Sequence, residues 1–155
     1  MIITIGSKVK DGEGNTYTLT EELGHGGFGC VYKAECEADK SVYAVKTLLY
    51  SFGDEATAAS FKNEVRISSE VSGEHVIRYI YAHDGDEYPE LPPYIIMEYA
   101  EGGTLEDQIE ERKKTNSPYS KEELRNLFLQ LVAGMKSINK KLVHRDIKPE
   151  NILIC

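Results

Sequence analysis

The chain has 155 residues, of which 41% are hydrophobic and 28% are charged, a balance typical of a soluble globular protein that buries its own core. Its 26 acidic and 18 basic residues give a formal net charge of −8, which disfavours nucleic acid as a main partner because a polyphosphate backbone would be repelled. No apolar run is long enough to cross a bilayer, and no basic segment precedes a long apolar one near residue 1, so neither a membrane segment nor a secretory signal is expected.

The first half of the chain is predicted to form a small antiparallel sheet that carries one helix. β-prone runs bounded by glycine, proline or polar turns are expected to be strands at residues 17–23, 30–36, 42–48, 76–82 and 94–99. In the third run, alternation places Val42, Ala44, Lys46 and Leu48 on one face. Apolar spacings of three and four residues then predict a helix over about 56–72.

From residue 101 onward the hydrophobic period becomes helical. Thr104 with Asp107 marks one helix start, and Ser120 with Glu123 forms a capping box at a second. The second helix is predicted to carry a sustained apolar stripe made of Leu124, Leu127, Phe128, Leu131, Val132, Met135 and Ile138. The pattern therefore predicts a sheet lobe followed by a helical lobe, and clefts between two lobes are common ligand sites.

A glycine-rich stretch joins the first two predicted strands. Gly24, Gly26 and Gly29 fit the pattern G-x-G-x-x-G, but residues 30–34 are β-prone, whereas a dinucleotide-binding fold would begin a helix there. No Walker-type Gly-Lys-Ser/Thr sequence follows. The stretch is thus predicted to be a hairpin whose backbone N–H groups can approach phosphates, because no Cβ stands in the way. A flexible hairpin turn without a ligand is the alternative.

Two charged residues fall on predicted apolar faces. Lys46 lies mid-strand on the face that carries Ala44, and Glu64 lies on the apolar side of the helix expected at 56–72. Burying either charge is unfavourable unless an opposite charge pairs with it. If the helix packs on the sheet, the two side chains can meet and share phosphate oxygens between them. For each residue alone, a solvated or snorkelling side chain is the alternative.

The most specific motif lies near the end of the sequence. Residues 144–151 read His-Arg-Asp-Ile-Lys-Pro-Glu-Asn. The motifs before them are the glycine loop, the run Val-Tyr-Ala-Val-Lys at 42–46, the helix glutamate Glu64, and the run Met-Glu-Tyr-Ala at 97–100. In this order they make residues 17–155 resemble the first part of a eukaryotic-type serine/threonine protein kinase domain.

The resemblance implies an α+β, protein-kinase-like fold. After an N-terminal extension at 1–16, a five-stranded antiparallel N-lobe with one helix is expected over about 17–97. A hinge at about 98–103 would lead to the first helices and the catalytic loop of a helical C-lobe, at about 104–155.

The resemblance also implies ATP and Mg²⁺ as cofactors and a protein that bears serine or threonine as the substrate. Asp146 would accept or orient the proton of the attacking hydroxyl, and Lys148 would neutralise the transferring phosphoryl group. Asn151 would bind Mg²⁺, and Lys46 would hold the α- and β-phosphates while Glu64 orients it. The residues implied to contact the nucleotide lie in the glycine loop, in an apolar sandwich around adenine and in the hinge: Leu23, Gly24, His25, Gly26, Gly27, Phe28, Gly29, Val31, Ala44, Lys46, Met97, Glu98, Ala100 and Leu153.

The sequence departs from the family pattern in containing no Asp-Phe-Gly motif, which in the family supplies the principal Mg²⁺ ligand shortly after the catalytic loop. We therefore expect the 155 residues alone to transfer little or no phosphate. A non-catalytic, kinase-like scaffold or nucleotide-binding remnant is the alternative, although a scaffold has no physical need for Lys46, Glu64, Asp146 and Asn151. Small-molecule phosphotransferases of related fold are a third class, but they do not usually combine Lys-Pro-Glu at 148–150 with this glycine loop.

Cysteine usage points to a reducing compartment. Cys30, Cys36 and Cys155 make an odd count without metal-like spacing. Reduced thiols in a cytoplasmic protein are therefore expected.

Overall fold

A computed structural model of the chain describes residues 3–26, 29–47, 59, 62–63, 66, 70–141 and 147–155. The chain forms two compact units, one made of Met1–Glu70 with Arg78–Tyr99 and the other of Val71–Ile77 with Ala100–Cys155. Among the helices in the described ranges, none has both the length and the hydropathy needed to cross a membrane.

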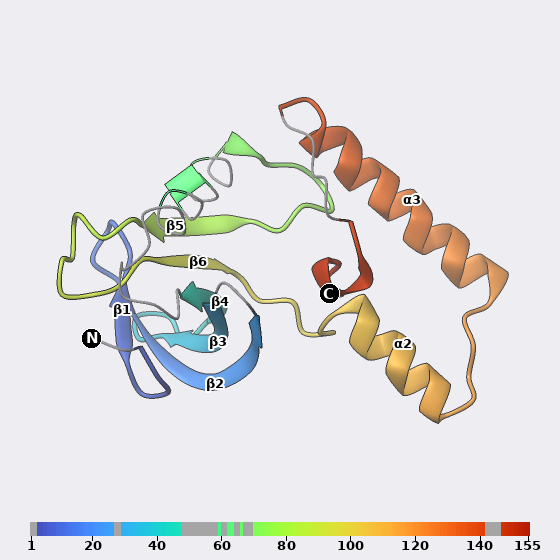
Figure 1. Cartoon of the computed structure of the whole chain (residues 1–155), viewed down its shortest axis with the longest axis horizontal. Helices are drawn as coiled ribbons and strands as arrows, with labels where there is room; N and C mark the ends of the chain where they lie inside the picture. Colours follow the sequence, from blue (N-terminus) through green and yellow to red (C-terminus); the bar gives the residue numbers. More distant parts are fainter. Residues whose placement is uncertain are drawn as a thin grey trace. The chain divides into compact units, whose positions relative to one another are not determined.

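The first unit contains a six-stranded antiparallel sheet in which the strands follow the order β1-β2-β3-β4-β6-β5 (Figure 1). The strands are β1 (Lys8–Lys10), β2 (Thr16–Gly26), β3 (Gly29–Cys36), β4 (Val42–Thr47), β5 (Tyr79–His83) and β6 (Tyr94–Glu98). The antiparallel sheet and the α+β class are confirmed. β1 is an addition to the five predicted strands, and it lies among residues predicted to be an extension.

β1 forms because a tight turn folds it back onto the start of β2. The buried carboxylate of Asp11 holds this turn by accepting hydrogen bonds from the backbone N–H groups of Glu13 and Asn15 and from the side-chain amide of Asn15, each at 2.9 Å. The hydroxyl of Tyr17 donates a fourth hydrogen bond at 2.8 Å. Burial acts to raise the pKa of Asp11, but the hydrogen bonds outweigh it, so this pKa lies below its ordinary value.

The sheet curls far enough to bring β6 against β1. The hydroxyl of the fully buried Tyr94 donates to the backbone carbonyl of Lys10 at 2.6 Å and accepts from the Lys10 N–H at 3.2 Å. Tyr88, in the loop between β5 and β6, donates to the backbone carbonyl of Asp11 at 3.2 Å. The enclosed core consists of Ile3, Val9, Tyr17, Leu19, Cys30, Tyr32, Ala34, Cys36, Val45, Tyr94 and Ile96.

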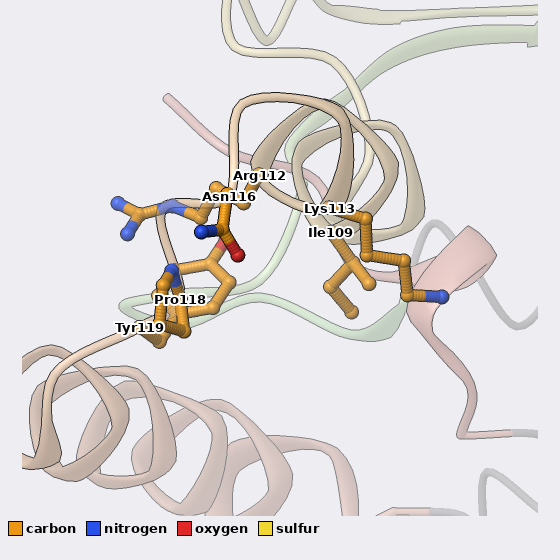
Figure 2. Close-up of a pocket in the computed structure, with 6 residues that line it drawn as sticks. All are labelled: Ile109, Arg112, Lys113, Asn116, Pro118 and Tyr119. Atoms are coloured by element: carbon orange, nitrogen blue, oxygen red, sulfur yellow. The ribbon is translucent and has the colours of Figure 1, made fainter.

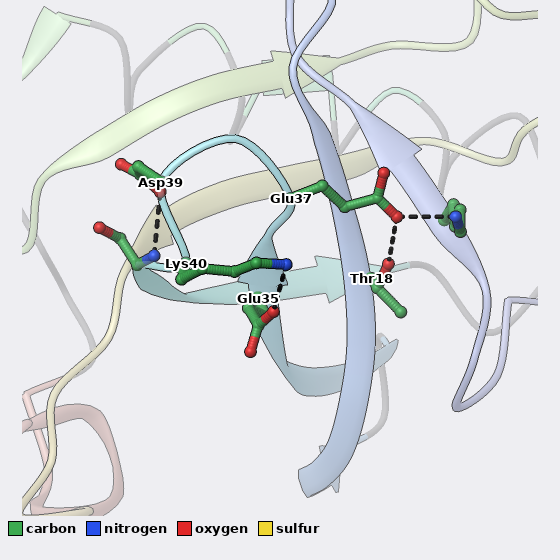
Figure 3. Close-up of polar contacts among 7 residues, drawn as sticks. Thr18, Glu35, Glu37, Asp39 and Lys40 are labelled. Atoms are coloured by element: carbon green, nitrogen blue, oxygen red, sulfur yellow. Dashed lines mark hydrogen bonds and ion pairs between the residues drawn. The ribbon is translucent and has the colours of Figure 1, made fainter.

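The turn between β3 and β4 lies where the sequence predicts it, and Figure 3 shows the polar contacts around it. Inside the turn, a carboxylate oxygen of Asp39 accepts a hydrogen bond from the Ser41 N–H at 2.9 Å. The carboxylate of Glu37 lies 2.7 Å from the ammonium of Lys8 and accepts a 3.0 Å hydrogen bond from the hydroxyl of Thr18. These exposed contacts link the turn to β1 and β2, and each contributes little to stability.

One predicted strand begins later than expected, and one predicted helix is described only in part. The strand predicted from Val76 begins only at Tyr79, because His75 has a left-handed backbone with φ of +61° and the Val76 N–H closes a turn onto the Gly73 carbonyl at 3.2 Å. Of the helix predicted at 56–72, the described residues 59, 62, 63, 66 and 70 are helical, whereas Glu64 lies outside the described residues, as does Leu48.

The second unit contains α2 (Leu105–Lys114), α3 (Lys121–Ile138) and the short 3-10 turn η1 (Pro149–Asn151) (Figure 1). Both predicted helix starts are confirmed. Thr104 caps α2 in a reciprocal pair with Asp107, and Ser120 caps α3 in the same way with Glu123. Each capping box satisfies two backbone or hydroxyl donors that a helix would otherwise leave unpaired.

α3 packs closely against the segment that precedes β5, within the same unit. A Cβ added at Gly134 would lie 2.6 Å from the backbone oxygen of His75, and one added at Gly73 would lie 2.5 Å from the hydroxyl oxygen of Ser137. Glycine at these two positions is what allows the backbone of residues 73–75 to approach the helix. The side chains of the predicted apolar stripe of α3 are half-buried or exposed to solvent, and Phe128 is 60% exposed.

Candidate nucleotide-binding site

The register of three strands places four of the predicted nucleotide-binding residues on one face of the sheet. Val31 of β3 lies opposite Lys46 of β4, and Ala44 of β4 lies opposite Met97 of β6. Because side chains alternate along a strand, these four residues share a face. The intervening row, formed by Tyr32, Val45 and Ile96, points into the core instead.

The face that carries Val31, Ala44, Lys46 and Met97 also carries Lys33, which lies opposite Ala44, so two cations flank its apolar residues. Ala44 and Met97 are 7% and 8% exposed, while Val31 and Lys46 are half-buried. The predicted neighbour Val42 is 42% exposed at the end of β4. The arrangement offers a smooth hydrophobic surface next to an ammonium group, which suits a flat apolar ring that carries a negatively charged tail.

The glycine-rich stretch is a hairpin, as the sequence predicts. β2 and β3 stay paired as far as Gly26 and Gly29, and His25 lies opposite Cys30. The stretch is followed by a strand and not by a helix, so it is not the turn of a dinucleotide-binding fold. Residues 27 and 28, which include the predicted Phe28, lie outside the described residues.

Around the hairpin, Leu23 is 41% exposed at an irregularity in the β2–β3 pairing, and the His25 ring nitrogen lies 3.2 Å from the Glu22 carboxylate. A Cβ built on Gly24 would meet no atom within 4 Å, and Gly24 has no positive φ. Neither packing nor backbone conformation within the described residues therefore requires a glycine there.

In the second unit, a short antiparallel pairing fixes the residues that follow the catalytic-loop motif. The Gly102 N–H donates to the Ile154 carbonyl at 2.8 Å, and the Ile154 N–H donates to the Gly103 carbonyl at 2.9 Å. Leu153, one of the predicted adenine contacts, pairs with Thr104 at the start of α2. A Cβ at Gly102 would lie 2.7 Å from the Ile154 oxygen, so glycine permits this close approach.

The same pairing holds the η1 turn beside α2. The Asn151 N–H donates to the Lys148 carbonyl at 2.9 Å, and the ammonium of Lys148 forms an exposed ion pair with Glu150 at 3.7 Å. Ala100, the first residue of this unit after the sheet, is buried. Asp146 lies outside the described residues.

Comparison with known proteins decides the family. The model of the protein kinase domain matches residues 17–155, which is most of the chain. The chain belongs to the protein kinase family. The sequence resemblance is thereby confirmed, and β2 to β6 form the sheet of this kinase domain.

Individual kinases match over nearly the whole chain. The interferon-induced, double-stranded RNA-activated protein kinase of Rattus norvegicus is 31% identical over 86% of this chain and 28% of its own length. Wee1-like protein kinase 2 of Homo sapiens is 34% identical over 87% of this chain and 24% of its own length. A kinase of Clostridium perfringens, named as a probable serine/threonine-protein kinase, is 34% identical over 91% of this chain and 20% of its own length. The chain thus spans less than a third of these relatives.

The kinase domain has one oxygen ligand suited to Mg²⁺ among the predicted residues that the structure describes. Asn151 offers an amide oxygen, and Mg²⁺ prefers hard oxygen ligands. In the described ranges, no group of three or more His, Cys, Asp or Glu side chains could hold a metal ion. An amide oxygen of this kind is suited to Mg²⁺ as one ligand among several.

A pocket of about 390 Å³ in the second unit of the kinase domain is separate from these residues (Figure 2). It is lined by Ile109, Arg112, Lys113, Asn116, Pro118 and Tyr119. The Arg112 guanidinium lies 3.9 Å from the Tyr119 ring centroid and 2.7 Å from the Glu123 carboxylate. The hydrogen bond from the Ser120 N–H, followed by that from Arg112, lowers the pKa of Glu123 to about 2. These contacts tie the loop before α3 to α2, and none of the predicted site residues lines the pocket.

Proposed function

We propose that this kinase domain binds ATP with Mg²⁺ and serves the transfer of the γ-phosphoryl group to serine or threonine hydroxyls of proteins. The observation that carries the proposal is the shared face of Val31, Ala44, Lys46 and Met97 beside the glycine hairpin, in a chain that belongs to the kinase family. An adenine ring packs against the apolar residues, and the triphosphate extends towards the ammonium of Lys46.

In this proposal Lys46 holds the α- and β-phosphates, and Glu64 orients Lys46. Phosphoryl transfer spreads negative charge over the γ-phosphate oxygens, so positioned cations and N–H groups lower the barrier more than covalent chemistry does. Asp146 orients the acceptor hydroxyl and takes its proton. Lys148, two residues further on, neutralises the transferring group.

The glycine hairpin covers the phosphates. The open space around Gly24 supports this role, because a glycine that neither packing nor φ requires leaves room for a ligand against the backbone. Leu23 and His25 are exposed next to it, and in this proposal Leu23 contacts the nucleotide base.

Asn151 holds Mg²⁺ through its amide oxygen. The bound ion supplies positive charge that neutralises the phosphate oxygens. The hydrogen bonds of the η1 turn and the pairing of Gly102 with Ile154 hold the backbone at Asn151 in place. This limits the positions that the Asn151 side chain can take.

The preference for serine and threonine rests on Lys148 and on the name of the Clostridium perfringens relative. The test is phosphoamino-acid analysis of a protein acceptor mixture after incubation of the full-length protein that carries this chain with Mg²⁺ and γ-labelled ATP. We expect the label in phosphoserine and phosphothreonine, and we expect it to disappear with Asp146→Asn. A label found mainly in phosphotyrosine would contradict the proposed acceptor.

A further inference from the structure

The loop between α2 and α3, residues 115–120, carries hydroxyl groups on Thr115, Ser117, Tyr119 and Ser120. The Thr115 hydroxyl donates to a backbone carbonyl of α2 at 2.9 Å, and the Tyr119 hydroxyl donates to a glutamine side chain of α2 at 3.0 Å. The Ser120 oxygen accepts the capping hydrogen bond of α3 at 3.2 Å. Ser117 is exposed, and its hydroxyl forms no hydrogen bond with the described part of the chain. It is therefore the hydroxyl of this loop that is available for modification.

The end of α2 has the hydrogen bonds of a Schellman motif. The Ser117 N–H donates to the Arg112 carbonyl at 2.9 Å, and the Asn116 N–H donates to the Lys113 carbonyl at 3.3 Å. Asn116 lies in the left-handed region with φ of +50°. In this motif the side chains at the positions of Ser117 and Arg112 frequently contact each other. A group attached to the Ser117 hydroxyl therefore starts next to the Arg112 side chain.

Pro118 directly follows the free hydroxyl. In these 155 residues, this is the one place where a proline follows a serine or threonine. Proline disfavours helical backbone in the residue before it and has no N–H of its own. An enzyme that binds this segment in extended form can therefore receive Pro118 in an apolar subsite without leaving a backbone donor unpaired.

The last turn of α2 is basic, in a chain whose net charge is −8. Arg112 uses one nitrogen for the 2.7 Å contact with Glu123, and a guanidinium has five N–H donors in all. Lys113 and Lys114 are exposed and form no ion pair within the described residues. A helix C-terminus carries roughly half a negative charge, which these two ammonium groups outweigh. The end of α2 can thus accommodate an anion that a helix C-terminus would otherwise repel.

We propose that Ser117 is a phosphorylation site for a protein kinase that selects serine followed by proline, and that Arg112 and Lys113 hold the phosphate. The Ser117 Oγ attacks the γ-phosphorus of ATP, the bond from that phosphorus to the bridging oxygen of ADP breaks, and the hydroxyl proton passes to a base of the modifying kinase. The product carries a charge of about −1.5 to −2, and its oxygens accept charge-assisted hydrogen bonds from the two cations. Asn116 and Pro118, on either side of Ser117, line the pocket of Figure 2, so the modification places a negative group at the edge of that pocket.

The first experiment maps the modification by mass spectrometry. The substrate is the full-length protein that carries this chain, with Asp146→Asn so that it does not label itself, and the enzyme is a proline-directed kinase with Mg²⁺ and ATP. We expect phosphate on Ser117, and we expect Pro118→Ala to lower the initial rate there by roughly tenfold or more, the discrimination that an apolar subsite provides. Ser41→Ala removes a hydroxyl from the exposed turn between β3 and β4, and this matched control should leave the rate unchanged. Absence of phosphate from Ser117, or equal rates with and without Pro118, would overturn the inference.

The second experiment follows the attached phosphate by a pH titration with phosphorus NMR. The second pKa of a phosphoserine is ordinarily about 6, and adjacent cations lower it. We expect a lower pKa for phosphorylated Ser117 in the folded protein than in urea, and we expect Lys113→Gln and Arg112→Gln each to raise it. Lys8→Gln, which removes an exposed ammonium from β1, should not change it. Equal values in the folded and unfolded protein would overturn the inference. Because Arg112 also contacts Glu123, Lys113→Gln decides the outcome if Arg112→Gln does not fold.

Discussion

Replacing Gly134 with valine is expected to destabilise the second unit by roughly 2–3 kcal/mol, because overpacking a tightly packed site costs about this much. The added Cβ would lie 2.6 Å from the backbone oxygen of His75 and 3.4 Å from its carbonyl carbon. A backbone atom cannot turn away as the end of a side chain can. The segment also has little freedom to shift, since Gly73 is equally close to Ser137 and His75 already has a left-handed backbone.

Urea unfolding followed by circular dichroism measures the effect of Gly134→Val. The control is Gln130→Val, which places the same β-branched residue at an exposed position one turn earlier in α3. The control should change stability by less than about 1 kcal/mol, as expected from helix propensity alone. Equal midpoints for the two variants would show that residues 73–75 do not rest on α3 as described.

The second large effect is expected for Asp11→Ala, at roughly 3 kcal/mol of unfolding free energy. The substitution leaves four buried or half-buried donor groups without their acceptor, namely the Tyr17 hydroxyl, the N–H groups of Glu13 and Asn15, and the side-chain amide of Asn15. Each donor left unsatisfied costs about 1–3 kcal/mol, and part of this is recovered when water enters the turn. The same change should loosen β1, whose turn depends on this carboxylate.

Asp11 should also make stability depend on pH. Its pKa in the folded protein lies below the ordinary value of 3.8, so the contribution is fully present above about pH 4 and is lost as pH falls through the lower, folded pKa. Other carboxylates titrate in the same range, so the informative quantity is the difference in unfolding free energy between the wild type and Asp11→Asn. We expect this difference to shrink as pH falls below 4. A difference that stays constant from pH 6 to pH 2 would contradict the role given to the carboxylate.

Most of the sheet and both later helices could be predicted, because their signals are local. Alternation along β3 and β4 separates core from open face, and the capping pairs of Thr104 and Ser120 mark the helix starts within a few residues. β1 could not be predicted in this way. Three residues with two lysines carry no strand signal, and what fixes Lys10 is the hydroxyl of Tyr94, 84 residues later.

The candidate site could likewise be predicted only in part from the sequence. The residue types at Lys46, Asp146 and Asn151 predict the chemistry because their order and spacing are specific, and the register of β3, β4 and β6 then follows from the antiparallel sheet. The 2.8 Å hydrogen bond from the Arg78 N–H to the Glu98 carboxylate was beyond prediction. A glutamate at a strand end gives no sign of which backbone group its carboxylate binds, since that depends on the register with a strand 15 or more residues earlier.

The most direct test of the account is a calorimetric comparison of ATP and adenosine binding, with Mg²⁺ present, by the wild type and Lys46→Ala. Loss of a charge-assisted contact to phosphate, worth about 1.5–3 kcal/mol, should weaken ATP by roughly 10- to 100-fold. Adenosine, which has no phosphates, should bind both proteins equally. Lys8→Ala removes an exposed ammonium at the edge of the same sheet and should leave both ligands unaffected. Identical ATP affinities for the wild type and Lys46→Ala would contradict the claim that Lys46, together with Val31, Ala44 and Met97, forms a binding site for a nucleoside triphosphate.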